Sequence, residues 1–191
     1  MTLVVGLGNP DLQYKNNRHN VGFMAIDALV DGQSSYEKIT KTAFKGELYK
    51  ASSMLLLKPA TYMNLSGESL RAVSDYFKPD EVIVIHDDLD LPFGTLRFKR
   101  GGGHGGHNGL RSIDAHIGSE YIRVRVGIGK PLFKADVSKY VLSDFSSCQK
   151  EHLQTILSHI VKSIKALLTQ DLKEVSLQYS LKQSLCEEDK H

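Results

Sequence analysis

Short runs of β-branched residues and leucine, separated by segments with helical periodicity, most strongly limit the folds open to this chain. The runs at residues 3–5, 53–57 and 82–85 lack polar alternation, which is typical of strands buried on both faces. Between them, residues 21–30 and 70–77 carry apolar side chains at helical spacing. This alternation predicts an α/β fold in which helices flank a twisted, mixed, largely parallel central sheet.

The second half of the chain shows one strand pattern and two helix patterns. Apolar residues between positions 122 and 128 alternate with Arg123 and Arg125. This predicts a strand with one face in the core and both arginines projecting from the outward face. Helices are predicted over residues 110–117, where Gly118 ends the helix, and over residues 153–168.

Length and composition favour a single globular domain. With 191 residues, of which 41% are hydrophobic, the chain can bury one sizeable core and needs no second domain. We expect this domain to span residues 1–185. Weak periodicity over residues 130–146 predicts a loop with at most a turn of helix, a candidate lid, and residues 186–191 are expected to form a frayed tail.

Cysteine content and hydropathy favour a cytoplasmic location. Cys148 and Cys186 are far apart in the sequence, fit no metal-ligand spacing and are too few to cross-link a domain of this size, which suits a reducing compartment. No apolar run approaches the roughly 18 residues needed to cross a bilayer. The N-terminus lacks the basic and apolar regions of a secretory signal. We therefore expect a cytoplasmic protein without a membrane partner.

Basic residues are concentrated in one segment, although the net charge is only +2. Residues 97–134 contain eight Lys and Arg against two acidic residues, which leaves 16 basic and 20 acidic residues elsewhere. Such clustering is typical of a nucleic-acid or phosphate partner, with a solvated charged face as the alternative. Within this segment, residues 101–109 read GGGHGGHNG. Glycines that expose successive backbone N–H groups favour binding of phosphate or a developing oxyanion.

The segment after the first predicted strand, GLGNP at residues 6–10, superficially resembles the start of a dinucleotide-binding loop. Asp11 occupies the place of the third glycine, and Pro10 does not suit a phosphate-binding turn. We therefore predict no nucleotide cofactor and interpret the segment as a tight turn that presents the side chain of Asn9.

A histidine and a carboxylate form the most reactive pair that the sequence offers. His19 lies at a predicted helix start, where the helix dipole is expected to keep the imidazole neutral near pH 7 and able to act as a base. The run HDDLD follows a buried strand, so one of its carboxylates could orient His19 at the carboxyl edge of the sheet. The alternatives are a histidine that only packs, solvated turn residues, and a divalent metal bound by His86, Asp87, Asp88 and the glycine-loop histidines.

Three asparagines lie at predicted strand exits or in loops. Asn9, Asn64 and Asn108 could converge as neutral hydrogen-bonding groups around a substrate amide or oxyanion. For Asn64 the alternative is a helix cap, a role that Ser66 could also fill.

Six segments taken together resemble the bacterial-type peptidyl-tRNA hydrolase family in their order and spacing. They are VGLGNP, RHNVG, KPATYMNLSG, HDDLDLPFG, GGGHGGHNGLRS and RVRVGIGKP, and the resemblance that they carry covers roughly residues 3–145. Asp88 departs from the glutamate of many relatives, and the C-terminal tail matches weakly.

The resemblance implies hydrolysis of the ester between a peptide and the 3′ ribose of tRNA, with no cofactor or metal. His19 would be the general base that activates water, and Asp87 would orient it and stabilise its charged form. On this resemblance the nucleophile is water rather than a side chain, and the lack of a GxSxG motif in the sequence agrees with that assignment.

The resemblance also assigns roles to the residues around this pair. It gives peptide and reacting-centre contacts to Asn9 and Asn64, and substrate and water contacts to Asn108. It gives tRNA-end and peptide contacts to Tyr14 and Met63, with core packing as the alternative for Met63. It gives tRNA 5′-phosphate contacts to Lys99 and Arg125. Asn20, Gly105 and His107 would support the site, with His107 either in the glycine loop or beside Asp87.

The expected partner is peptidyl-tRNA, bound at its acceptor stem and 3′ end by a monomer. A non-catalytic RNA-binding module of the same fold is the main alternative. The presence of the complete set of proposed catalytic residues favours the esterase, and a metal-dependent hydrolase ranks last.

Overall fold

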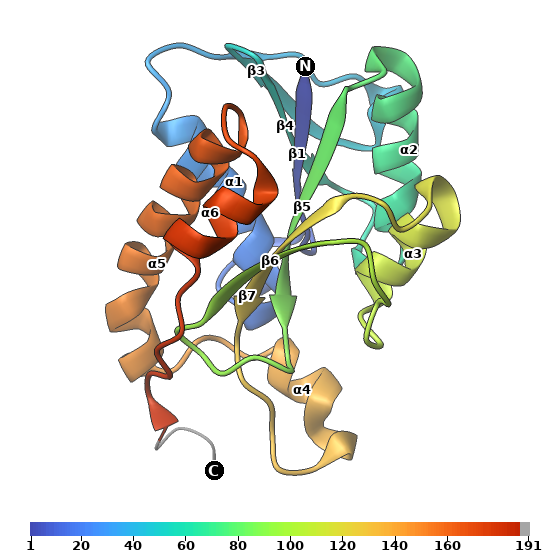
Figure 1. The fold of residues 1–191 in the computed structure, drawn as a ribbon. Coiled ribbons are helices and arrows are strands. Elements are labelled where there is room, and N and C mark those ends of the chain that lie inside the picture. Colours follow the sequence, from blue (N-terminus) through green and yellow to red (C-terminus); the bar gives the residue numbers. More distant parts are fainter. Residues whose placement is uncertain (188–191) are drawn as a thin grey trace.

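The computed structural model describes residues 1–187 and is built around one seven-stranded sheet (Figure 1). The strand order is β2-β3-β4-β1-β5-β7-β6. Strands β4, β1, β5 and β7 run parallel to one another, while β2, β3 and β6 are antiparallel to their neighbours. The strands are β1 (Thr2–Gly6), β2 (Glu37–Lys38), β3 (Gly46–Ala51), β4 (Met54–Pro59), β5 (Glu81–Asp88), β6 (Leu96–Arg100) and β7 (Ile122–Gly127).

Helices cover both faces of the sheet (Figure 1). Helices α1, α5 and α6 pack on one face, α2 and α3 pack on the other, and α4 lies beyond the carboxyl ends of the parallel strands. Their bounds are α1 (Val21–Asp31), α2 (Ser66–Phe77), α3 (Asn108–Ile117), α4 (Val137–Val141), α5 (Ser147–Leu167) and α6 (Leu172–Tyr179).

The central strands are buried on both faces, as their unbroken apolar runs predict. In β1, Leu3 and Val5 belong to the core under α2 and α3, and Val4 belongs to the core under α1 and α5. All three side chains are fully buried. Burial on both faces removes any need for polar alternation. The predicted α/β class, with a mixed and largely parallel sheet, is confirmed.

Several elements differ from the sequence-based expectation. Helix α5 begins at residue 147 rather than 153, because Ser146 and Gln149 form a capping box there. Helix α2 begins four residues earlier than predicted, at Ser66. The sequence did not indicate β2, β3, β6 or α6, which are short or lie toward the sheet edge, where the hydrophobic pattern is weak.

The expectation that both arginines of β7 face outward is wrong for Arg123. Strand β7 lies between β5 and β6, and Arg123 is only 3% exposed. Its guanidinium donates to the carbonyl oxygens of Gly102 and Gly103. The glycine-rich loop therefore covers this face, and Arg123 holds the loop instead of facing solvent.

The expectation that the two cysteines remain unlinked is also wrong. Cys148, in the first turn of α5, and Cys186 form a disulfide with a Cα–Cα distance of 6.0 Å. Residue 186 is therefore tied to α5 and does not belong to a frayed tail, while the rest of that predicted tail from residue 188 lies outside the described residues. Nothing in a separation of 38 residues could reveal this proximity.

The segment 130–146 contains more helix than a single turn. It holds a 3-10 helix (Lys134–Asp136) followed directly by α4. Arg18 ties α4 to the neighbouring elements, since its guanidinium donates to the Tyr140 carbonyl and to Gln149, and stacks over the Tyr140 ring. The candidate lid is thus anchored at α4, and its role as a lid remains a prediction.

No helix within residues 1–187 is long and apolar enough to span a bilayer.

Candidate active site

The carboxyl ends of the parallel strands gather the proposed catalytic residues at one edge of the sheet. His19 lies in a 3-10 helix (Arg18–Asn20) that leads into α1, and Asp87 lies near the end of β5. Gly22 permits this placement, because a Cβ there would lie 2.5 Å from the Ile85 carbonyl oxygen on β5. Close backbone packing of α1 on β5 therefore brings His19 beside Asp87.

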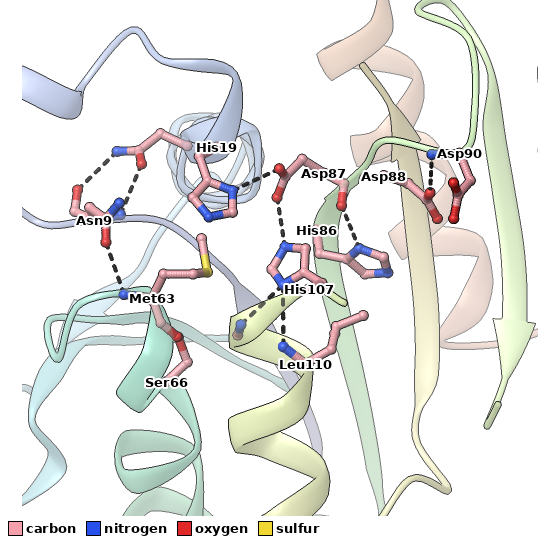
Figure 2. A network of polar contacts seen from close by, with 12 residues as sticks. Asn9, His19, Met63, Ser66, His86, Asp87, Asp88, Asp90, His107 and Leu110 are labelled. Atoms are coloured by element: carbon pink, nitrogen blue, oxygen red, sulfur yellow. Dashed lines mark hydrogen bonds and ion pairs between the residues drawn. The ribbon is translucent and has the colours of Figure 1, made fainter. Parts of the chain in front are cut away.

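Asp87 joins two histidines through its two carboxylate oxygens (Figure 2). Its Oδ2 lies 2.7 Å from His19 Nδ1, and its Oδ1 lies 2.8 Å from His107 Nε2. The Nδ1 atom of His107 accepts the backbone N–H groups of Gly109 and Leu110 at the start of α3. His107 must therefore carry its proton on Nε2 and donate it to Asp87.

This arrangement also fixes the tautomer of His19. An ionised carboxylate only accepts hydrogen bonds, so His19 Nδ1 donates its proton to Asp87. In the neutral ring, Nε2 is then left with a lone pair. The His19 side chain is 14% exposed, which leaves room for approach by water, whereas Asp87 is 2% exposed.

Asp87 raises the pKa of His19. Burial lowers that pKa, but the charge of Asp87 and its hydrogen bond outweigh burial, so the pKa lies above the ordinary value of 6.5. The helix dipole was expected to favour the neutral ring, whereas the net shift of the His19 pKa is in the opposite direction. Burial raises the pKa of Asp87, but attraction to His19 and His107 and their hydrogen bonds keep it well below its usual range. Asp87 is ionised throughout the physiological pH range.

Two hydrogen bonds join the Asn20 side chain to the backbone of Asn9, next to His19. The Asn20 side chain accepts the Asn9 backbone N–H at 2.8 Å and donates to the Asn9 carbonyl at 2.9 Å. The Asn9 Oδ1 atom accepts the Met63 backbone N–H at 2.9 Å. Because Oδ1 is occupied in this way, the Asn9 Nδ2 group is oriented as a donor.

Met63 lies where the three asparagine-bearing segments meet. Its backbone binds Asn9, Asn64 follows it in the 3-10 helix Met63–Leu65, and its sulfur packs on Gly109, next to Asn108. A Cβ on Gly109 would lie 2.6 Å from that sulfur. The fold therefore brings the three segments together, as the hypothesis of convergence requires.

A cavity of about 200 Å³ opens at this edge of the sheet. It extends from the His19–Asp87 pair to basic residues on β6 and β7, and Asp88 Oδ2 accepts the Nε–H of Arg125 at 2.8 Å. Lys99 is exposed at the end of β6. The site residues that line the cavity are His19, Asp87, Lys99, Gly105, His107, Asn108 and Arg125.

Comparison with known proteins assigns the family. The family model described as peptidyl-tRNA hydrolase matches residues 3–187. The chain belongs to the peptidyl-tRNA hydrolase family. A peptidyl-tRNA hydrolase of Sulfurovum sp. is 56% identical over 184 residues, covering 95% of this chain and 97% of the relative. One of Sulfurimonas denitrificans is 58% identical over 180 residues, covering 94% and 97%.

A solved structure from this family has the same fold. The crystal structure of peptidyl-tRNA hydrolase from Acinetobacter baumannii superposes with a TM-score of 0.89 at 35% sequence identity. The match covers 95% of this chain and 96% of that one. The family resemblance predicted from the six sequence segments is confirmed.

Of the five proposed substrate contacts, only Asn108 lines the cavity that contains His19, and Asn9 and Met63 are buried. Asn64 is exposed, and Tyr14 is half-buried at the end of the 3-10 helix Leu12–Tyr14. Neither lines the cavity that contains His19. Their proposed contacts therefore involve parts of a bound substrate that extend beyond the cavity.

The backbone conformation of Tyr62, which precedes two of the proposed substrate contacts, is a feature that the sequence did not reveal. Its φ of +63° is strained for a tyrosine, and its hydroxyl donates to Asp11 at 2.8 Å. This contact fixes the backbone just before Met63 and Asn64. A tyrosine gives no sequence signal for a positive φ, unlike glycine or asparagine.

The residues proposed as metal ligands have other partners. His86 Nδ1 contacts the Asp87 carbonyl oxygen, and Asp88 contacts Arg125 and the Asp90 backbone N–H. Burial and the neighbouring His107 lower the pKa of His86 to about 4. His19, Asp87 and His107 have ligand atoms close together, but these atoms hydrogen-bond one another. The geometry therefore favours an acid–base pair over a metal centre.

Proposed function

We propose that this chain hydrolyses the ester that links a peptide, or an N-blocked amino acid, to the 3′ ribose of tRNA. The observation that carries the proposal is the hydrogen-bonded chain His19–Asp87–His107, which leaves His19 Nε2 as an available base in a cavity lined with basic residues. Membership of the peptidyl-tRNA hydrolase family supports the same reaction. The products are a peptide carboxylate and a free tRNA.

In the first step, His19 Nε2 takes a proton from water while the water oxygen attacks the ester carbonyl carbon. Asp87 stabilises the imidazolium that forms and remains ionised itself. The tetrahedral intermediate then collapses, and the ribose oxygen leaves with the proton from His19. One water is consumed, and the neutral imidazole is restored.

Amide groups stabilise the negative charge of this intermediate without adding charge to the free site. The Nδ2 donor of Asn9 is preorganised by the bond from Met63 to Oδ1, and Asn64 and Asn108 complete the proposed substrate contacts. A single preorganised donor of this kind typically lowers the barrier by about 3 kcal/mol. Tyr14 and Met63 are proposed to contact the tRNA end and the peptide.

The proposed partner is the acceptor stem and 3′ end of peptidyl-tRNA, bound by a monomer in the cytoplasm. Lys99 and Arg125 are proposed to bind the 5′ phosphate. Contacts of this type position an RNA without reading its sequence, which suits an enzyme that accepts many tRNAs.

Selective cleavage of blocked substrates tests the proposed function. N-acetyl-aminoacyl-tRNA should be hydrolysed much faster than the same tRNA carrying a free amino acid, because the proposed contacts recognise a peptide-like amide. Release of labelled amino acid from the two substrates measures the ratio. Binding of tRNA without ester cleavage would instead support the RNA-binding module.

Removing a phosphate contact should weaken binding in a salt-dependent way. In the Lys99→Ala variant we expect a higher KM, and the slope of log affinity against log salt concentration should become shallower by about one unit. Lys162→Ala, an exposed lysine on α5, is the matched control and should keep the wild-type slope. Equal slopes for wild type and Lys99→Ala, measured by tRNA binding from low to high salt, would remove Lys99 from the phosphate site.

A further inference from the structure

We infer that Cys148, His152 and Cys186 form a binding site for a thiophilic divalent cation, with Zn²⁺ as the preferred ion, when the two cysteines are reduced. The sulfur atoms and a ring nitrogen of His152 all lie within 4.8 Å of one another. Thiolate and imidazole are the ligands that zinc prefers in proteins. This site lies on α5, outside the cavity that contains His19.

The helix brings two of the ligands onto one face. Cys148 and His152 are four residues apart in α5, so their side chains point to the same side of that helix. All three ligand residues are half-buried, which limits competition from solvent. Within residues 1–187, His152 has no other hydrogen-bond partner.

Backbone contacts hold the third ligand in place independently of the disulfide. Leu181 exchanges both backbone hydrogen bonds with Leu96 on β6, and the Leu185 N–H donates to the Phe93 carbonyl at 2.8 Å. Leu185 directly precedes Cys186. Reduction of the disulfide therefore leaves the Cys186 backbone beside α5 and the site preorganised.

The cluster can open to the dimensions of a tetrahedral zinc site once the disulfide is reduced. With Zn–S bonds of about 2.3 Å and Zn–N bonds of about 2.0 Å, tetrahedral ligand atoms lie roughly 3.5–4 Å apart. In the disulfide the two sulfurs are covalently bonded, and after reduction the 6.0 Å between the two Cα atoms lets them separate to this spacing by rotation about χ1. Three protein ligands leave the fourth position to water.

The disulfide and the metal site are alternative states of the same cysteines. A dithiol reductant transfers two electrons and two protons to the Cys148–Cys186 bond and itself becomes a disulfide. Zn²⁺ then displaces the two thiol protons and binds the thiolates. The position of Cys148 in the first turn of α5 favours its thiolate form.

The sequence places only two of the three ligands, Cys148 and His152, at a spacing that suggests a shared site. Considered alone, the cysteines fit no metal-ligand pattern, and only the Cys-x3-His spacing on a helix suggests a shared face. The third ligand, Cys186, is placed beside them only by the pairing of its segment with β6 in the folded structure.

Metal titration of the reduced full-length protein tests the inference. Co²⁺ serves as a spectroscopic probe, and we expect one ion per chain, with a thiolate-to-cobalt charge-transfer band and the intense visible bands of tetrahedral coordination. Zn²⁺ should displace Co²⁺ and abolish these bands. The oxidised protein should bind neither ion at this site.

Variants distinguish this cluster from adventitious binding. His152→Gln should raise the Zn²⁺ dissociation constant by more than about tenfold, since even indirect partners of zinc ligands contribute that much. Cys148→Ser, which removes one of the two thiolates, should at least halve the charge-transfer band. His159→Gln, which alters another histidine of α5, should leave the titration unchanged. Circular dichroism of each variant shows that the chain has folded.

Zinc affinity that is the same in His152→Gln and wild type, or in oxidised and reduced protein, would overturn the inference. Hydrolysis of N-acetyl-aminoacyl-tRNA is measured on the same samples. The two sites share no residue. A negative metal titration would therefore not contradict the proposed hydrolase function, and a lack of ester hydrolysis would not contradict the metal site.

Discussion

Replacing His19 with alanine should reduce hydrolysis of N-acetyl-aminoacyl-tRNA by about 10²- to 10⁴-fold, the usual contribution of a general base. The variant lacks the ring nitrogen that takes the proton from water, while Lys99 and Arg125 remain to bind the tRNA phosphates. We therefore expect the loss in kcat, with tRNA affinity largely retained. Single-turnover hydrolysis and filter binding measure the two quantities.

Two matched variants distinguish the loss of His19 as a base from the loss of its contacts with neighbouring residues. His19→Asn keeps a side-chain N–H that can donate to Asp87 but has no titrating nitrogen, so it should lose as much activity as His19→Ala. His159→Gln, at a histidine that contacts the Tyr179 carbonyl on α6, should retain wild-type activity. Turnover by His19→Ala within tenfold of wild type would exclude His19 as the base.

The Asp87→Asn variant should lose activity on the order of 10⁴-fold, the size of the same change in a Ser-His-Asp triad. Both His19 and His107 donate to Asp87, but an asparagine offers only one oxygen acceptor. The start of α3 fixes the tautomer of His107, so the oxygen of the new amide satisfies that donor. His19 then turns its Nδ1 lone pair toward the amide NH₂, and its Nε2 becomes protonated and unable to act as a base.

The pH profile of the residual activity of Asp87→Asn gives a second test of the coupling between Asp87 and His19. Asp87 raises the pKa of His19, so wild-type activity should fall as the pH drops through a value above 6.5. Without the carboxylate charge, the acidic limb should move to lower pH. Asp75→Asn, at an exposed carboxylate on α2 that pairs with Arg71, should leave both rate and profile unchanged. An unshifted acidic limb in Asp87→Asn would contradict the proposed coupling.

The central sheet could be predicted because its signal is local. Leu3, Val4 and Val5 are apolar in succession, and only a strand covered on both faces buries all three. The edge elements gave no such signal. Strand β6, Leu96–Arg100, alternates basic and apolar residues and reads equally well as a basic loop until its antiparallel pairing with β7 is known.

The candidate site residues also divide into those that the sequence could predict and those that it could not. His19 and Asp87 could be proposed from residue type, from their positions after strands and from the family resemblance. The direction of the His19 pKa shift could not, because it depends on a 2.7 Å contact between residues 68 positions apart. Arg123 likewise has the sequence pattern of an outward-facing residue, yet it is buried beneath a loop that begins more than 20 positions earlier.

By itself, the sequence determined the α/β class, the family and the residues of the proposed catalytic pair, because hydrophobic periodicity and short motifs are properties of neighbouring residues. Only the tertiary structure decided which atoms meet: the two histidines on Asp87, the arginine under the glycine loop, and the cysteines beside His152. These contacts join residues that are distant along the chain. Their distances follow from strand order and helix packing, which no local pattern encodes.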